Sequence, residues 1–162
     1  MNRSITSNGG PYVGLPVAQL AHFQGFEDQT LHEEIFKTAT DEGGVAELSI
    51  GSALLLGTPD TLFWFPEKNG GVLVRVVSFD ADDDEELSKL IVQLDDEDWI
   101  PAGEIEAVEP WFVVDAALCG EDAQGEGLEL DLSGSYRVHT RELLGDGLEL
   151  LLVRLKKVID ED

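Results

Sequence analysis

Cysteine, cations and long apolar runs are all scarce in this chain, and each shortage excludes a class of protein. The single cysteine, Cys119, cannot form an intrachain disulfide, which favours a reducing compartment. No apolar run approaches the roughly 20 residues that span a bilayer, so we expect no membrane partner. Residues 1–16 lack the continuous apolar stretch and the cleavage site of a signal peptide, so we expect a cytoplasmic protein.

The shortage of cations leaves the chain strongly acidic. Ten Lys and Arg face 34 Asp and Glu, which gives a formal net charge of −24. Phosphate backbones and anionic membranes repel a chain of this charge, so we expect no direct binding to nucleic acid. The same field attracts basic proteins and metal cations. The alternative is that the charge serves solubility alone.

Groups that carry out catalysis are also sparse. The three histidines, His22, His32 and His139, lie in unrelated contexts, and the sequence has neither an H-E-x-x-H nor a C-x-x-C pair. The segments "GTPDT" and "SNGGP" lack the glycine spacing and the lysine of a phosphate-binding loop. Cys119 precedes acids rather than the cations that would activate a thiolate. We therefore expect no enzymatic activity and no cofactor.

The alternating acids of "DADDDEE" raise the question of a calcium loop. An EF-hand loop needs acids at its first, third and fifth positions, glycine at the sixth and glutamate at the twelfth. Asp80, Asp82 and Asp84 meet the first requirement, but the sixth residue is Glu85 and the twelfth is Ile91. A dedicated metal site is not expected, and weak binding of divalent cations stays open as an alternative.

Hydrophobic periodicity predicts one mainly β domain, residues 1–162. The chain is long enough to bury a core, and 43% of its residues are hydrophobic. From Val45 onward, short apolar or alternating segments are separated by Gly, Pro and Asn-Gly turns, which indicates antiparallel hairpins. The segment "GVLVRVVSF" is apolar on both faces except at Arg75, which predicts a central strand. The predicted fold is α+β: an antiparallel β-sandwich or bent sheet of about eight or nine strands with one to three short helices.

One helix is predicted within the most acidic stretch. In "DDDEELSKLIVQL", Leu87, Leu90, Ile91 and Leu94 recur at helical spacing, so we expect this helix to pack on the sheet. Acids at its start are favoured by the helix dipole by about 0.3–1 kcal/mol each. A second short helix is expected in "VAQLAHFQG".

Two acidic runs flank the predicted helix and form the candidate partner-binding site. Trp99 adjoins the second run and is a candidate aromatic anchor, whereas Trp64 and Trp111 are expected in the core. Surrounding charge would steer a basic partner towards this site. The candidate residues are Asp82, Asp83, Asp84, Glu85, Glu86, Asp95, Asp96, Glu97, Asp98 and Trp99.

Several motifs resemble a bacterial immunity protein family. "SNGGPYVGLP" and "ALLLGTPDTLFWFPEKNGGVLVR" resemble the Gly-Gly-Pro strand and the later "LG", Pro, Trp and "GG…VR" elements of the family catalogued as immunity protein twenty-one. "WFVVDAALCG" and "LELDLSGSYRVHT" resemble the ending that such proteins share with competence-associated nuclease inhibitors. The resemblance implies a non-enzymatic partner of a polymorphic toxin, and it transfers no binding residues.

Charge and resemblance lead to the same hypothesis. The protein is expected to be an immunity protein that binds and neutralises a cognate toxin domain through an acidic surface. The toxin is expected to be basic, and a nuclease is one candidate. The alternatives are an acidic β-sandwich binding module with a regulatory role, or a weak divalent-cation-binding protein. The oligomeric state is not predicted.

Overall fold

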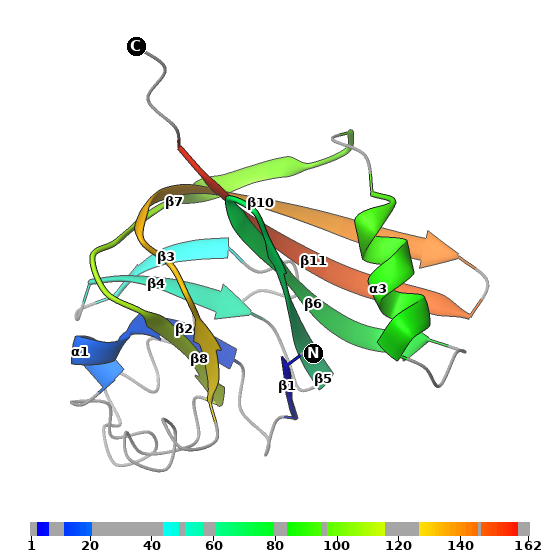
Figure 1. Ribbon diagram of the computed structural model, residues 1–162, viewed down its shortest axis with the longest axis horizontal. Coiled ribbons are helices and arrows are strands. Elements are labelled where there is room, and N and C mark those ends of the chain that lie inside the picture. The colour runs from blue at the N-terminus through cyan, green and yellow to red at the C-terminus, as the bar shows by residue number, and fades with distance from the viewer. Residues whose placement is uncertain are drawn as a thin grey trace.

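Two antiparallel sheets make up most of the described chain (Figure 1). The computed structural model describes residues 3–6, 12–20, 44–48, 51–56, 61–79, 84–94, 97–115, 127–145 and 147–158. Within these residues the predicted fold class is confirmed: the protein is mainly β, with a helix packed on one sheet.

The first sheet has six strands, and long hairpins of neighbouring segments build most of it. Lys68 and Asn69 form the tight turn between β5 (Thr61–Glu67) and β6 (Gly70–Phe79), as the Asn-Gly signal predicted. The central position of β6 is also confirmed, because it pairs with both β5 and β11 (Leu148–Lys157). In spatial order the strands are β1 (Arg3–Thr6), β5 (Thr61–Glu67), β6 (Gly70–Phe79), β11 (Leu148–Lys157), β10 (Gly134–Gly145) and β7 (Ile100–Ala107).

The second sheet has five strands. In spatial order they are β3 (Gly44–Leu48), β4 (Gly51–Leu56), β2 (Tyr12–Pro16), β8 (Trp111–Asp115) and β9 (Leu128–Leu130). The described residues thus contain eleven strands, more than the eight or nine expected. The additional β1 has only four residues, too few for a period-2 pattern to stand out, and it forms by pairing with β5.

The main core lies between the two sheets. Tyr12 and Leu54 from the second sheet pack in one cluster with Trp64 and Leu73 from the first. Trp64 is 3% exposed and Trp111 is 2% exposed, which confirms their predicted place in the core. The alternation of "LELDL" is confirmed as well, because its three leucines, Leu128, Leu130 and Leu132, are buried in this cluster.

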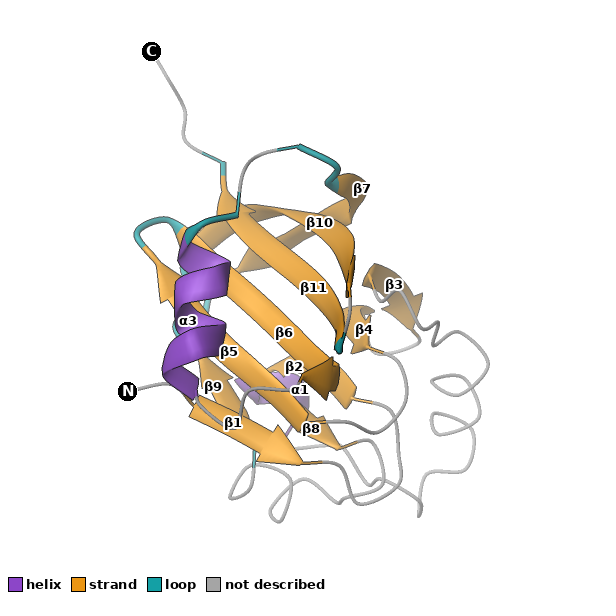
Figure 2. Ribbon diagram, turned by 90° about the vertical axis from the view of Figure 1, so that its right-hand side faces the viewer, coloured by secondary structure: helices purple, strands orange, loops and turns teal. Residues whose placement is uncertain are grey.

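Helix α3 (Asp84–Val92) covers part of the opposite, outer face of the six-stranded sheet (Figure 2). Leu87 and Ile91 are buried, and they pack in a second cluster with Leu150 and Leu152 of β11. Leu90 and Leu94 are half-buried against the same cluster. The predicted helix and its apolar face are therefore confirmed, and the six-stranded sheet is apolar on both sides where α3 lies.

Other predictions concern segments that the structure describes only in part. Helix α1 (Val17–Leu20) begins the helix expected in "VAQLAHFQG", and the remainder of that segment lies outside the described residues. His22, His32 and Cys119 also lie outside them. Neither α1 nor α3, the two helices of the described chain, is long and apolar enough to cross a membrane.

A close contact between Gly71 and Trp64 joins β5 and β6 in the main core. A Cβ atom added at Gly71 would lie 2.4 Å from Cη2 and 2.6 Å from Cζ2 of Trp64, and 2.9 Å from the carbonyl oxygen of Phe65. Real Cβ atoms essentially never approach so closely. The indole therefore rests directly on the glycine backbone, and the absence of a side chain at Gly71 lets Trp64 fill the core.

We expect Gly71→Ala to destabilise the protein by about 1–3 kcal/mol, because the methyl group would displace the Trp64 indole from a close-packed core. Urea unfolding followed by far-UV circular dichroism measures the change. Gly145→Ala is the matched control, since its added Cβ meets nothing closer than 3.8 Å. Equal stabilities of the two variants would contradict the proposed packing role.

Candidate functional site

The structure separates the two predicted acidic runs by the length of α3. Asp84 and Glu85 lie in the first turn of α3, and Glu86 follows them with an exposed side chain. Glu97 and Asp98 follow the helix and are also exposed. A helix of nine residues is about 13 Å long. The described acids therefore form two groups at opposite ends of α3.

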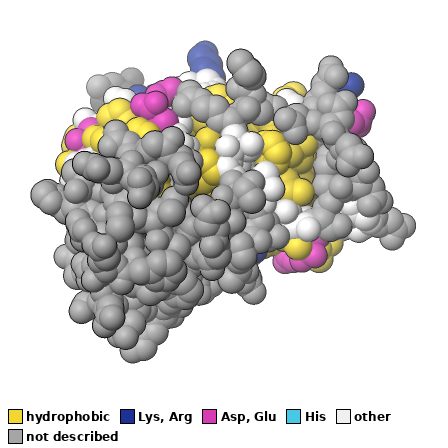
Figure 3. Space-filling model, turned by 90° about the horizontal axis from the view of Figure 1, so that it is seen from below, with side chains coloured by type: hydrophobic (Ala, Val, Ile, Leu, Met, Phe, Trp, Pro, Cys, Tyr) yellow, Lys and Arg dark blue, Asp and Glu magenta, His cyan; other side chains and the backbone are white. Residues whose placement is uncertain are grey.

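Four of the predicted site residues fall outside the described residues: Asp82, Asp83, Asp95 and Asp96. On the face shown in Figure 3, the described acidic side chains also form small separate groups among hydrophobic and uncharged ones. The described part of the predicted site is therefore Asp84 to Glu86 at the start of α3 and Glu97 to Trp99 after it.

Exposed apolar side chains flank the second acidic run. Val92, the last residue of α3, is 80% exposed, and Ile100, the first residue of β7, is 60% exposed. Exposed aliphatic side chains beside charges are typical of protein contact surfaces, where the apolar groups are desolvated and the charges lie at the rim. The neighbourhood of Glu97 and Asp98 therefore combines both kinds of group.

Trp99 is held against the protein's own arginines rather than projecting from the surface. The Arg154 guanidinium carbon lies 4.5 Å from the centre of the indole ring, and that of Arg141 lies 5.7 Å from it. Trp99 is half-buried and packs against the cluster beneath α3. Cation–π contacts of this kind contribute about 0.5–2 kcal/mol each. Trp99 thus ties the start of β7 to the outer face of β10 and β11.

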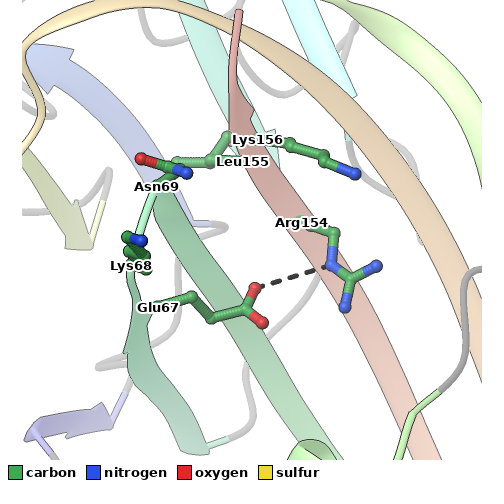
Figure 4. Close-up of a pocket in the computed structure, with 6 residues that line it drawn as sticks. All are labelled: Glu67, Lys68, Asn69, Arg154, Leu155 and Lys156. Atoms are coloured by element: carbon green, nitrogen blue, oxygen red, sulfur yellow. Dashed lines mark ion pairs between the residues drawn. The ribbon is translucent and has the colours of Figure 1, made fainter. Parts of the chain in front are cut away.

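Arg154 also contacts β5, at a shallow cavity on the sheet. Its Nε lies 3.5 Å from Oε1 of Glu67, and the Arg154 side chain is only 13% exposed (Figure 4). The cavity has a volume of about 220 Å³ and is lined by Glu67, Lys68, Asn69, Arg154, Leu155 and Lys156. Two lysines and an arginine against one glutamate leave this cavity with a net positive lining.

The cavity continues into a strip of basic side chains along β10 and β11. Residues 137, 139 and 141 of β10 alternate to one face, and residues 154 and 156 of β11 share that face with Leu150 and Leu152. Arg137 lies directly opposite Lys156 in the β10–β11 register, and His139 lies directly opposite Arg154. We define the basic strip as Arg137, His139, Arg141, Arg154 and Lys156.

Sequence reasoning did not identify the basic strip, although a signal for it exists. "RVHTR" places three basic or titratable side chains at alternate positions, and "RLK" places two. Alternation in a strand puts such side chains on one face. Once the two segments pair as a hairpin, their alternating cations form a single surface.

The side chains that could ligate a metal lie apart from one another within the described residues. No group of three or more His, Cys, Asp or Glu side chains within them could hold a metal ion. His139 on β10 and Glu67 on β5 are separated by strands β11 and β6, so the imidazole and the carboxylate do not face each other as direct neighbours. Asp80 and Asp82 of the calcium-loop comparison lie outside the described residues. The surfaces that the described chain does offer are charged and suited to binding.

Comparisons of the chain with protein-family models, with curated proteins and with solved structures found no match. The resemblance to immunity proteins therefore rests on the quoted sequence motifs, and function has to be argued from the surfaces described above.

We expect a double-mutant cycle between Trp99→Leu and Arg154→Ala to give a coupling free energy of about 0.5–2 kcal/mol, because each substitution removes the same cation–π contact. Urea unfolding of the two single variants and the double variant measures it. Arg137→Ala replaces Arg154→Ala in the control cycle, since Arg137 pairs with Glu104, its Nε 3.6 Å from Oε1. Additive effects of Trp99→Leu and Arg154→Ala would contradict the contact.

Proposed function

We propose that this protein is an immunity protein that captures a basic toxin domain by means of the acids at the ends of α3. The observation that carries the proposal is a net charge of −24 together with exposed acids around a helix anchored to the sheet: Glu86 on α3, and Glu97 and Asp98 after it. Leu87 and Ile91 hold α3 in place, so the acids beside it are presented from a fixed element. A rigid display lowers the entropic cost of forming a complex.

The charge would act chiefly on the rate of association. Electrostatic steering raises association rate constants towards about 10⁸–10⁹ M⁻¹s⁻¹ at low salt, compared with about 10⁵–10⁶ for uncharged surfaces. A cell that makes a toxin needs rapid capture of that toxin. A toxin domain that cleaves nucleic acid would have to present cations to phosphate, and those cations would complement the acids around α3.

Affinity would come from a smaller desolvated centre, because exposed ion pairs contribute only about 0–1 kcal/mol each. Val92 and Ile100 are suited to this role, since both are largely exposed and flank Glu97 and Asp98 in the sequence. Trp99 would support this centre indirectly, because its contacts with Arg154 and Arg141 hold the start of β7 on the sheet. Inhibition in this scheme needs occupancy alone and no chemistry by the protein.

We expect the gene directly upstream to encode the toxin, and its C-terminal domain to arrest growth when it is expressed alone in a laboratory bacterium. Co-expression of the present protein should restore growth, because the toxin would be held in a complex. Colony counts measure rescue, and co-purification of the two chains measures the complex. Growth arrest that persists despite co-expression would contradict the proposal. It would favour the alternative, an acidic β-sandwich binding module with a regulatory role.

We expect Asp83, Glu86, Asp96 and Glu97, all replaced by Lys, to slow association with that toxin domain by at least about tenfold, because steering depends on local charge. Stopped-flow fluorescence at several salt concentrations measures the rate constant. The expected difference from the unmodified protein shrinks as salt rises.

The matched control replaces Glu47, Glu104, Glu106 and Asp131 by Lys. These four exposed acids lie on β3, β7 and the segment after β9, and their reversal changes the net charge by the same amount. Association should slow by less than about threefold in the control if the acids beside α3 do the steering. Equal slowing in both variants would assign the effect to net charge and not to this surface.

A further inference from the structure

The basic strip is a concentration of cations on a protein that has few of them. Four of the ten Lys and Arg residues in the chain lie on this one face of β10 and β11, together with His139. We propose that the basic strip is a second interaction surface, which docks an extended acidic segment of a protein partner. The basic strip adjoins the second acidic run at Trp99, and its proposed role does not depend on the toxin-binding function.

The register of β10 and β11 indicates that the strip serves binding. Arg137 and Lys156 are direct cross-strand partners, and both side chains are exposed. Like charges directly opposite each other destabilise an antiparallel pair, whereas opposite charges would stabilise it. Acids are abundant in this chain, with 34 Asp and Glu, and an acid at position 137 or 156 would pair favourably with the cation opposite it. Glu104 of β7 pairs with Arg137 and offsets part of this repulsion, and an anionic partner beside Lys156 would offset the rest.

The spacing of the strip suits an extended polypeptide. Alternate residues of an antiparallel strand lie about 6.8 Å apart, twice the rise of about 3.4 Å per residue. Arg137, His139 and Arg141 repeat at this distance along β10, and Arg154 and Lys156 repeat at it along β11. A peptide strand with acids at every second position has the same repeat. Its carboxylates would meet the side chains of β10 and the exposed Lys156, whereas Arg154, whose side chain is 13% exposed, stays packed against Trp99.

Carboxylates at both edges limit the width of the site. Glu67 on β5 pairs with Arg154, and Glu104 on β7 pairs with Arg137. Strands lie about 4.8 Å apart, so the four steps from β5 to β7 cover about 19 Å. A nucleic-acid duplex is as broad as this space and would press phosphates against both glutamates. A single extended peptide fits between them.

The net charge of the protein does not prevent this docking. At about 0.15 M salt the Debye length is about 8 Å, so a docked carboxylate responds to the nearest side chains and not to the whole molecule. A second copy of this chain is a poorer occupant, because it would bring many more acids within a Debye length of this chain's own acids than a short peptide would. The strip therefore fits a short acidic segment of a different protein.

The test uses a fluorescein-labelled peptide of six Glu-Ser repeats, titrated with the full-length protein at about 0.15 M salt and followed by fluorescence anisotropy. We expect saturable binding to the unmodified protein. Lys156→Glu should weaken it by at least about fivefold, because it reverses one charge of the exposed Arg137–Lys156 pair. Lys89→Glu is the matched control: Lys89 is exposed on α3, and its reversal changes the net charge equally. The control should weaken binding by less than about twofold.

Three results would overturn the proposal. The first is absence of saturable peptide binding, or equal weakening by Lys156→Glu and Lys89→Glu. The second is tighter binding of a twelve-nucleotide oligothymidylate than of the peptide, which would assign the strip to nucleic acid. The third is a dimer in analytical ultracentrifugation that Lys156→Glu dissociates, which would make a second copy the occupant. Thermal unfolding of both variants confirms that they are folded.

Discussion

Helix α3 covers only part of the outer face of the six-stranded sheet, and this partial cover determines which side chains of that face are buried and which can contact a partner. β11 carries leucines where the helix covers it, at positions 150 and 152, and basic side chains further along the same face, at 154 and 156. Burial of each leucine contributes about 1.5–3 kcal/mol. The helix is therefore anchored at one place, with acids in its first turn and after its end, and an uncovered part of the sheet lies beside it.

Trp99 lies at the border between these two regions. It contacts the apolar cluster under α3 and, through its ring, two arginines of the basic strip. An aromatic ring suits such a border because its edge and body pack against apolar groups while its face attracts a cation. The same residue thus holds the end of the second acidic run and orders the arginines of the strip, so the two charged surfaces share one support.

Much of the fold was predictable because local patterns carry it. The hairpins were readable from Asn-Gly and Gly turns, the packed face of α3 from four apolar residues at helical spacing, and the buried Leu128, Leu130 and Leu132 from alternation. The candidate site was less predictable. The role of Trp99 depends on Arg141 and Arg154, which lie 42 and 55 residues later in the chain, and no local pattern contains that contact.

By itself the sequence determined the charge, the mainly β character, the order of hairpins and the amphipathic helix, because each depends on composition or on residues near one another in the chain. Only the tertiary structure decided that the two acidic groups lie at opposite ends of α3, that Trp99 packs on arginines, and that alternating cations of two strands form one strip. Those features depend on which strand pairs with which and on where the helix docks. Strand pairing and helix docking are set by the burial of apolar surface throughout the whole domain.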